Sequence, residues 1–414
     1  MDFRQFDPEA AAILAAEEQR QRDTLMMIPS ENYVSATVTA AQATVFGNKY
    51  AEGAPAARYY NGCTNMDAIE RLAATRAKNL FGAEHANVQP LSGAQMNTAV
   101  YLALLKPGDT VMALDLNQGG HLTHGSPVNF SGRLYRFVHY GVDRETEVLD
   151  LDQIARQARE VRPKLIVTGA TAYPRFWDFA AFRRIADDVG ALLMADVSHI
   201  AGLIVGGVHP DPVPHCDVVT TTTQKTLRGP RSGLILCRNG HAQKIDKAVF
   251  PGTQGGPHMH TVFAKAVAFK EAQSEGFRAV QALTVANART LAATLTRNGL
   301  RLISGGTDNH LMLVDLRPLD LTGKAAANLL EEAGIVVNKN TVPYDPKSPS
   351  ICSGIRLGTP ALSTRGMSGA EMERIGGWIT AVLQNSGDED LRREIAEEVR
   401  ALCARFPVEK VGNS

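Results

Sequence analysis

The order of apolar and polar positions along the chain predicts buried strands that alternate with helices. Short apolar runs, which are typical of strands buried in a parallel sheet, occupy residues 110–114, 164–170 and 191–195. Together these elements predict a mostly parallel α/β sheet with ligands at the strand ends. Helical stretches are expected at residues 10–22, 66–80, 92–105, 261–297 and 391–402.

The two ends of the chain add detail to this pattern. Asp7 and Pro8 form a good helix start, because a capping aspartate precedes a proline at the first helical position. Residues 25–61 show no periodicity, although they carry several polar and aromatic side chains, and residues 309–316 predict a strand in the last third. The final helix is amphipathic and is interpreted as packing only.

Composition excludes several classes of function. The chain has 414 residues, enough for a large core and two domains, and its 43 Lys and Arg balance its 43 Asp and Glu. This balance removes the electrostatic case for a nucleic-acid or anionic-membrane partner. No apolar run is long enough to span a membrane, and the first residues lack a signal-peptide core. The five cysteines are scattered without metal-ligand spacing. We expect a reduced, cytoplasmic protein without a metal.

Two candidate chemical groups lie at predicted strand ends. Asp196 ends the apolar run that begins at Ala191, and Lys225 follows four threonines just before Gly229 and Pro230 turn the chain. A lysine amine and a buried carboxylate suit pyridoxal phosphate, which needs an imine partner and an anion at its pyridine nitrogen. Each feature alone also fits a helix cap or a solvated turn residue. Residues 92–93 open a helix with small side chains, as anion sites do.

Longer motifs identify a family resemblance. Residues 30–33 (SENY), 47–53 (GNKYAEG), 116–126 (LNQGGHLTHGS), 196–203 (DVSHIAGL), 220–234 (TTTTQKTLRGPRSGL), 250–257 (FPGTQGGP) and 353–360 (SGIRLGTP) resemble serine hydroxymethyltransferase. The motifs follow the family's order from about residue 25 to 365, so the resemblance covers nearly the whole chain. It implies a fold type I transferase with a seven-stranded, mostly parallel sheet. The implied parts are an N-terminal arm (1–50), a large cofactor-binding domain (51–280) and a smaller C-terminal α/β domain (281–414).

The resemblance also implies a set of site residues. Lys225 would hold the cofactor, Asp196 would keep its pyridine nitrogen protonated, and His121 would stack on its ring. The implied catalytic residues are Lys225, Glu52, His121, Asp196 and Tyr60. The implied cofactor-binding residues are Lys225, Asp196, His199, Ser92, Gly93, Ala94, Gln95, His121, Gln224, Tyr50, Gly255 and Gly256. Substrate binding is implied for Ser30, Tyr60, Arg356, Arg231 and Glu52, and folate binding for Tyr59, Leu116, Gly120, Leu122 and Asn340.

The implied reaction cleaves Cα–Cβ of a serine-type amino acid and passes the one-carbon unit reversibly to the cosubstrate tetrahydrofolate. In the family some arm residues serve the neighbouring subunit's site, which implies a homodimer with shared active sites. A folate-independent aldolase and a catalytically silent paralogue are the alternatives. The joint presence of Lys225, Asp196, His121, Glu52 and Arg356 argues against the silent paralogue.

Several positions depart from the family's usual residues. The changed positions are Gln118, Thr171, Ser198, Gln224, Ser232 and Ser350. Replacement of a phenylalanine by Ser350 would remove an apolar contact worth about 2–3 kcal/mol if fully buried. A cluster of such changes suggests a substrate with a substituted Cα, namely 2-methylserine exchanging with D-alanine. Ordinary serine and glycine exchange is the competing interpretation.

Overall fold

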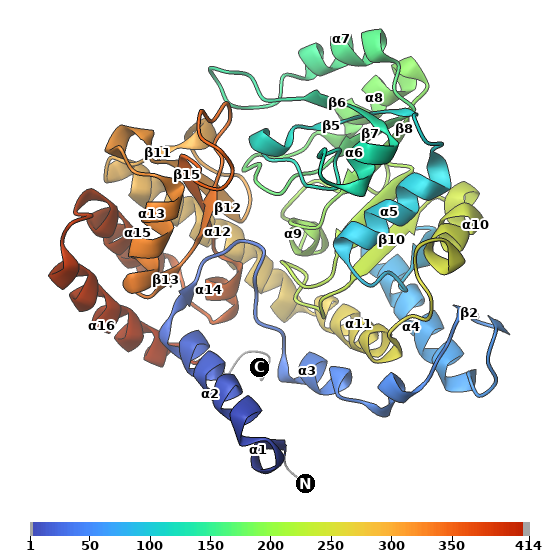
Figure 1. The fold of residues 1–414 in the computed structure, drawn as a ribbon, viewed down its shortest axis with the longest axis horizontal. Helices are drawn as coiled ribbons and strands as arrows, with labels where there is room; N and C mark the ends of the chain where they lie inside the picture. Colours follow the sequence, from blue (N-terminus) through green and yellow to red (C-terminus); the bar gives the residue numbers. More distant parts are fainter. Residues whose placement is uncertain (1–2, 409–414) are drawn as a thin grey trace.

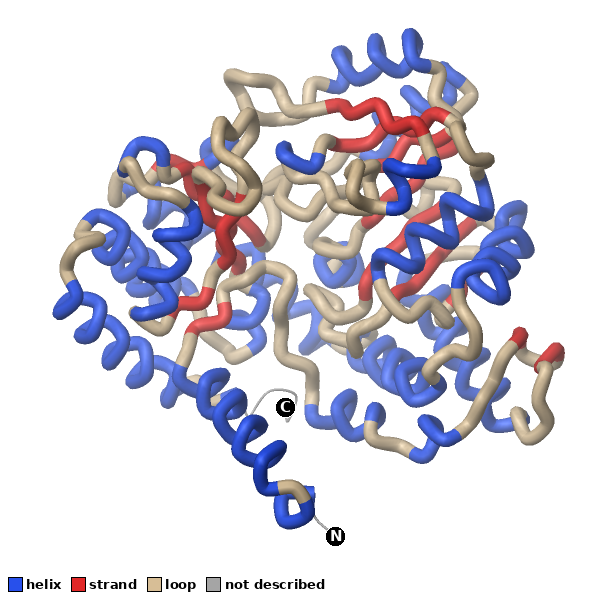
Figure 2. The backbone as a smooth tube through the Cα atoms, viewed as in Figure 1, coloured by secondary structure: helices blue, strands red, loops and turns tan. Residues whose placement is uncertain are grey.

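The computed structural model describes residues 3–408 and contains two large sheets, each with its own helices (Figures 1 and 2). The larger sheet has seven strands in the order β4-β10-β9-β8-β7-β5-β6. Only β10 runs antiparallel to its neighbours, so the predicted mostly parallel seven-stranded sheet is confirmed. The strands are β4 (His85–Asn87), β5 (Thr110–Leu114), β6 (Arg136–Tyr140), β7 (Leu165–Thr168), β8 (Leu192–Asp196), β9 (Val218–Thr222) and β10 (Gly233–Cys237).

Helices cover both faces of this sheet, because its strands are apolar on both sides. In β5, Val111 and Ala113 belong to the core beneath α5 and α10, while Met112 and Leu114 face the opposite core. That opposite core also takes residues from α4, α7, α8 and α11. The helices are α4 (Thr64–Phe81), α5 (Gly93–Leu104), α6 (Phe130–Leu134), α7 (Leu151–Val161), α8 (Phe179–Val189), α9 (Ala201–Val205), α10 (Asn239–Lys247) and α11 (Met259–Ala272).

The second sheet is antiparallel, in the order β11-β12-β15-β14. A separate hydrophobic core joins it to the long helices that follow and flank it. The strands are β11 (Arg301–Leu302), β12 (Leu311–Asp315), β14 (Asn338–Asn340) and β15 (Gly354–Gly358), and the helices are α12 (Glu275–Arg297), α13 (Gly323–Glu332), α14 (Pro360–Thr364), α15 (Gly369–Gln384) and α16 (Glu389–Arg405).

The N-terminal segment connects the two halves of the molecule. Its strand β1 (Leu25–Met26) pairs in parallel with β13 (Ile335–Val336) beside the smaller sheet. The chain then crosses to α3 (Ala36–Gln42), which packs against α11 below the large sheet (Figure 1). The remaining elements here are α1 (Phe3–Phe6), α2 (Pro8–Asp23) and the hairpin strands β2 (Gly53–Ala54) and β3 (Ala57–Arg58).

Most predicted elements are present, with one clear exception. Residues 261–297 do not form one helix, because the chain breaks between α11 and α12, where the Ser274 hydroxyl accepts a hydrogen bond from Phe277 N at 3.1 Å and caps α12. The expected domain boundaries remain a prediction. Helix α12 runs across the expected boundary at residue 280, and the outer limits at residues 1 and 414 lie outside the described residues. No helix within residues 3–408 has the length and apolar character needed to cross a membrane.

Candidate functional site

The two candidate chemical groups lie at the ends of neighbouring parallel strands. Asp196 is the last residue of β8 and pairs in register with Thr220 of β9, while Lys225 follows the end of β9 by three residues. Burial lowers the pKa of Lys225 to about 8; Asp196 opposes this effect, and Arg356 and Arg231 add to it. The Lys225 amine is therefore a far better nucleophile near neutral pH than a solvated lysine.

Asp196 is a buried carboxylate whose charged form is stabilised by its neighbours. Burial alone would raise its pKa, but hydrogen bonds from His124 and Ser198 hold the pKa of Asp196 well below its usual range. His121, His124 and Asp196 offer ligand atoms within 4.8 Å of one another, as a metal site would. His124 Nδ1 accepts from His121 N and its Nε2 donates to Asp196, so both of its nitrogens are already engaged and it is a hydrogen-bond donor here rather than a metal ligand.

The N-terminus of α5 forms a third part of the site. Ser92 caps this helix and accepts a hydrogen bond from Gln95 N at 3.3 Å, while Gln95 Nε2 donates to Thr253 Oγ1 at 2.6 Å. A Cβ at Gly93 would lie 2.7 Å from Thr222 Cγ2, so the close approach of α5 to β9 requires glycine. Free N–H groups and the positive end of the helix dipole suit a phosphate here.

One cavity of about 240 Å³ contains eight of the predicted site residues. An adjoining cavity of about 610 Å³ shares Gln224 and Arg231 with it and is also lined by Ser30, which places this predicted substrate residue next to the first cavity. The predicted residues that line the smaller cavity are Gly93, Ala94, His121, Asp196, His199, Gln224, Lys225 and Arg231.

His121 lines this cavity as a neutral ring. Burial lowers the pKa of His121 to about 4, and His124 adds to the lowering. The Nδ1 atom of His121 lies 2.8 Å from Thr123 Oγ1, which holds the ring in place. A neutral, fixed imidazole can cover one face of a flat cofactor. On the far side of the site, His199 Nδ1 lies 3.4 Å from His310 Nε2, and the two rings stack.

Arg356 is a buried cation at the junction of the two sheets. It lies on β15, is 6% exposed, and donates from Nη1 to the carbonyl of Thr171 at 2.6 Å and from Nε to Asn338 Oδ1 at 3.2 Å. No carboxylate within residues 3–408 lies at ion-pair distance from Arg356; burial lowers its pKa to about 10, and the charge of Glu31 opposes this effect. Because Thr171 lines the site cavity, this unpaired guanidinium is placed to receive an anion there.

A second group of predicted residues lies together but outside that cavity. A Cβ at Gly256 would lie 3.3 Å from the Tyr50 ring and 3.4 Å from Glu52, and the Tyr50 and Tyr60 rings are 5.7 Å apart. Gly255 would likewise approach Glu52, and Tyr59 contacts Phe250. None of these residues lines the Lys225 cavity. The fold therefore divides the predicted site residues of one chain into two groups.

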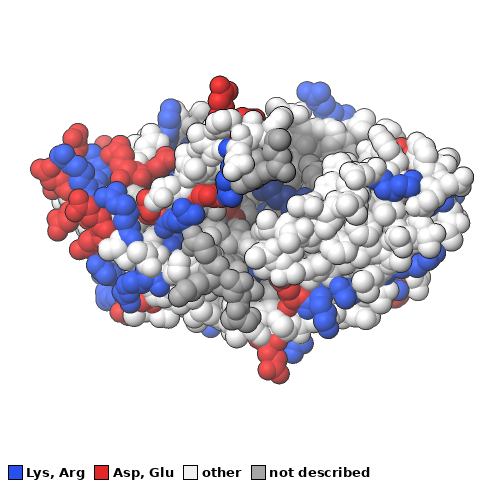
Figure 3. All heavy atoms as spheres, turned by 90° about the horizontal axis from the view of Figure 1, so that it is seen from below, with Lys and Arg blue, Asp and Glu red and all other residues white. Residues whose placement is uncertain are grey.

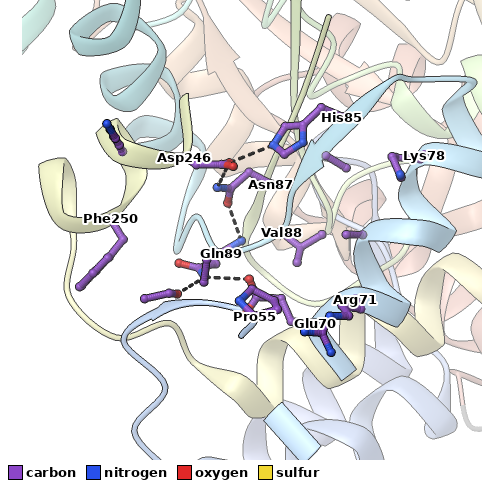
Figure 4. Close-up of a pocket in the computed structure, with 15 residues that line it drawn as sticks. Pro55, Glu70, Arg71, Lys78, His85, Asn87, Val88, Gln89, Asp246 and Phe250 are labelled. Carbon is purple, nitrogen blue, oxygen red and sulfur yellow. Dashed lines mark hydrogen bonds and ion pairs between the residues drawn. The ribbon is translucent and has the colours of Figure 1, made fainter. Parts of the chain in front are cut away.

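A buried hydrogen-bond network fixes the hairpin that follows Glu52. Gln89 donates to Glu70 at 2.8 Å and to the carbonyl of Gly53 at 2.9 Å, and Arg58 donates to the carbonyls of Ala51 and Gly53. Figure 4 shows Glu70 and Gln89 joined by this hydrogen bond in the lining of a cavity of about 330 Å³ beside the hairpin. Hydrogen bonds to the carbonyls of Ala51 and Gly53, and from Tyr59 N to the carbonyl of Glu52, therefore hold the Glu52 backbone.

The predicted folate positions occupy two loops near the strand ends. Leu116 and Gly120 lie in the turn after β5, where a Cβ at Gly120 would lie 2.2 Å from the carbonyl oxygen of Leu114. Leu122 follows and is 47% exposed. Asn340 ends β14, two residues after the Arg356 partner Asn338 and thus on the same strand face. Thr171 links the two places: its N–H donates to the carbonyl of Gly119 at 2.7 Å, and its own carbonyl accepts from Arg356, which also bonds Asn338.

Sequence reasoning missed the polar residues that surround Asp196. Asn97 Nδ2 donates to Asp196 Oδ2 at 2.8 Å, and His124 Nε2 lies 3.3 Å from the same oxygen. Asn97 is fully buried in the middle of α5, one turn after Gly93. A buried polar residue inside a predicted apolar helix was the available signal, as was the second histidine of the 116–126 motif.

The positions that depart from the family pattern do not all lie in the cavity. Thr171, Ser198 and Gln224 line it. Gln118 instead accepts a bond from Val142 N at 2.8 Å, and Ser232 donates to the carbonyl of Pro90 at 2.7 Å. Ser350 is exposed and lies 2.8 Å from the Ser348 hydroxyl. Three of the six departures therefore bond the backbone outside the cavity lining or lie at the surface.

Comparison with known proteins agrees with the geometry of the cavity. The family model described as serine hydroxymethyltransferase matches residues 3–379. Proteins named serine hydroxymethyltransferase from Synechococcus sp. (strain JA-3-3Ab) and Rippkaea orientalis are each 58% identical to this chain, covering 97% and 98% of it and 96% and 95% of their own lengths. The protein of that name from Nostoc sp. (strain PCC 7120) is 57% identical over 97% of this chain and 94% of its own.

Proposed function

The chain belongs to the serine hydroxymethyltransferase family, and we propose that it transfers the hydroxymethyl group of serine reversibly to tetrahydrofolate, leaving glycine. Its cofactor is pyridoxal phosphate, and tetrahydrofolate is its cosubstrate. The observation that carries the proposal is the single cavity that joins Lys225, Asp196 and the N-terminus of α5. Amine, carboxylate and anion site are the three features that this cofactor requires.

Each part of that cavity has a proposed task. Lys225 would supply the amine that holds the cofactor aldehyde, and Asp196 would accept the N–H of the pyridine ring. The start of α5, with Ser92, Gly93, Ala94 and Gln95, receives the phosphate, and His121 covers the ring. When bound, the cofactor accepts the electrons released as a bond at the substrate Cα breaks. His199 and Gln224 line the space around Lys225.

The cationic residues of the site orient the substrate. Arg356 clamps the amino-acid carboxylate through its planar fork, and Ser30, Tyr60 and Arg231 assist. By fixing the carboxylate, these residues would orient the substrate Cα at the cofactor site and so select which of its bonds breaks. Glu52 acts as the general acid–base that exchanges the proton of the substrate hydroxyl. Folate contacts Leu116, Gly120 and Leu122 after β5, Asn340 at the end of β14, and Tyr59 of the second residue group.

We further propose that the protein works as a homodimer with shared sites. Four predicted site residues do not line the Lys225 cavity of their own chain, which supports a second copy supplying its own to that cavity: Glu52, Tyr50, Gly255 and Gly256. Tyr59 and Tyr50 are 73% and 67% exposed, an unusual state for large aromatic side chains. Seen from below, the side on which α3 and the β2 hairpin lie, the right half of the molecule shows few charged side chains (Figures 1 and 3).

Mixing two inactive variants tests the shared sites. Lys225→Ala and Glu52→Gln each disable every site when alone. In a mixed dimer, however, one of the two sites receives both native residues. Unfolding and refolding an equal mixture should restore about one quarter of wild-type activity, because half of the dimers are mixed and each has one intact site. A mixture as inactive as its components would show that each chain completes its own site.

Turnover of two amino acids tests the substrate. Serine with tetrahydrofolate should give methylene-tetrahydrofolate at a much higher kcat/KM than 2-methylserine does. The second candidate, exchange of 2-methylserine and D-alanine, is supported by Thr171, Ser198 and Gln224, the three altered residues that line the cavity. A preference for 2-methylserine would establish it. Cleavage that tetrahydrofolate does not accelerate would instead support a folate-independent aldolase.

A further inference from the structure

The carboxylate of Asp196 is saturated with hydrogen-bond donors from the protein. Asn97 Nδ2 and His124 Nε2 approach Oδ2 at 2.8 and 3.3 Å, while the backbone N–H and the hydroxyl of Ser198 approach Oδ1 at 3.1 and 2.5 Å. A carboxylate has about four lone-pair directions, so these four donors occupy all of them. A fifth donor, such as the N–H of a cofactor ring, has to share an oxygen with one of them.

The direction of the Ser198 hydroxyl bond is fixed by its surroundings. Thr222 N donates to Ser198 Oγ at 3.0 Å, so the hydroxyl hydrogen is free to point at Asp196. At 2.5 Å the contact has the short length of an O–H···O⁻ bond. Ser198 is 7% exposed, so water scarcely competes for this bond. The hydroxyl therefore joins the end of β8 to the end of β9 and stabilises the Asp196 anion.

We propose that Ser198 is a positioning residue that limits how strongly Asp196 binds the pyridine N–H of the cofactor. The proposal rests on the proposed contact between Asp196 and that nitrogen. Hydrogen bonds to a carboxylate stabilise its charged form and reduce its affinity for a proton. With Ser198 in place, the shared proton stays on the ring nitrogen and Asp196 keeps its charge. The ring then keeps the full positive charge that draws electrons from the substrate.

Removing the hydroxyl makes a definite spectroscopic prediction. In Ser198→Ala the carboxylate has one donor fewer, is more basic, and comes closer in proton affinity to the ring nitrogen. The bond between them should shorten, and the far-downfield proton NMR signal of the ring N–H should move further downfield in the substrate-free holoenzyme. Ser198→Cys retains a weak donor and should move the signal the same way by a smaller amount.

The matched control is Ser363→Ala. This serine is also buried, and its hydroxyl accepts a bond from Asn287 Nδ2 at 2.9 Å in the core of the smaller sheet. Ser363→Ala removes one buried hydroxyl that does not contact Asp196, so the ring N–H signal should not shift. A general loosening of the protein would alter the signal in both alanine variants, and that result would contradict the proposal.

A third variant separates this inference from the proposed function. Asp196→Asn removes the charge, so the ring N–H signal should disappear or move strongly upfield. If it does so while Ser198→Ala leaves the signal where it was, Ser198 has no influence on the bond and the inference is wrong. If Asp196→Asn leaves the signal unchanged, Asp196 does not contact the ring nitrogen, and the proposed cofactor assignment fails together with the inference.

Discussion

Arg356 makes the sharpest prediction about substrate binding, because the structure leaves part of its guanidinium without a partner. Nε and Nη1 are engaged by Asn338 and Thr171, whereas Nη2 has no hydrogen bond to any residue of the described range 3–408. Its burial also makes the unpaired charge costly. A substrate carboxylate would relieve that cost and complete the hydrogen bonds of the fork. We therefore change Arg356 to glutamine.

The magnitude follows from the burial of the pair that Arg356 would form. Truncating one partner of a buried, hydrogen-bonded charge pair costs about 2–5 kcal/mol, which corresponds to about 30- to 5,000-fold in the dissociation constant. Arg356→Gln should weaken serine binding by this factor. Arg356→Lys keeps the charge but loses the fork and should recover only part of the affinity. Cofactor affinity should be unchanged in both variants.

Equilibrium binding of serine and of serinamide supplies the assay. Serinamide lacks the carboxylate, so Arg356→Gln should weaken serine far more than serinamide. Arg301→Gln is the control, since Arg301 pairs with Glu147 and Asp315 away from the cavity and should leave both affinities unchanged. Equal weakening of serine and serinamide would refute the clamp and leave Arg356 with only a structural role.

Three further predictions concern the cofactor site and its support. The pKa of Lys225 is lowered to about 8, so the rate at which the apoenzyme binds pyridoxal phosphate should rise with pH through about 8 and then level off. A rate that continues to rise up to about pH 10 would contradict this prediction. Gly93→Ala places a Cβ 2.7 Å from Thr222, and the resulting strain of about 1–3 kcal/mol should weaken cofactor binding by about 5- to 150-fold. The control variant Gly240→Ala meets open space and should bind the cofactor normally. Equal cofactor dissociation constants for the two variants would refute this prediction. The buried Lys265 donates to the carbonyls of Val88, Pro90 and Gly233. Lys265→Met leaves these carbonyls without that donor and should lower the free energy of unfolding in urea by about 1–3 kcal/mol, whereas the exposed Lys270→Met should change it little. Similar unfolding curves for the two variants would show the network to be unimportant.

The parts of the site that a short stretch of sequence defines could be predicted. Asp196 ends an apolar run and Lys225 follows a β-branched one, and parallel strands place such ends side by side. The cap of α5 was equally local, since Ser92 and Gly93 stand next to each other in sequence. These features depend on neighbouring residues and on the period of the strand, both of which are visible in the sequence.

The remaining features depend on contacts between distant parts of the chain. Arg356 approaches the cavity only because β15 of the second sheet lies next to Thr171, and 185 positions separate the two residues. The hydrogen bond from Asn97 to Asp196 spans 99 positions. Gln118 was interpreted as a changed site residue, yet it bonds the backbone at Val142. Periodicity describes one element at a time, and it could not have distinguished these cases.

Mapping of the covalently bound cofactor tests the central claim most directly. Borohydride reduction of the holoenzyme, followed by digestion and mass spectrometry, locates the amine that carries the cofactor. The structure predicts a single labelled lysine, Lys225, and loss of that label when serine is present during the reduction. Labelling of another lysine, such as the buried Lys265, would contradict the account, since the cavity between β8, β9 and α5 would then not be the cofactor site.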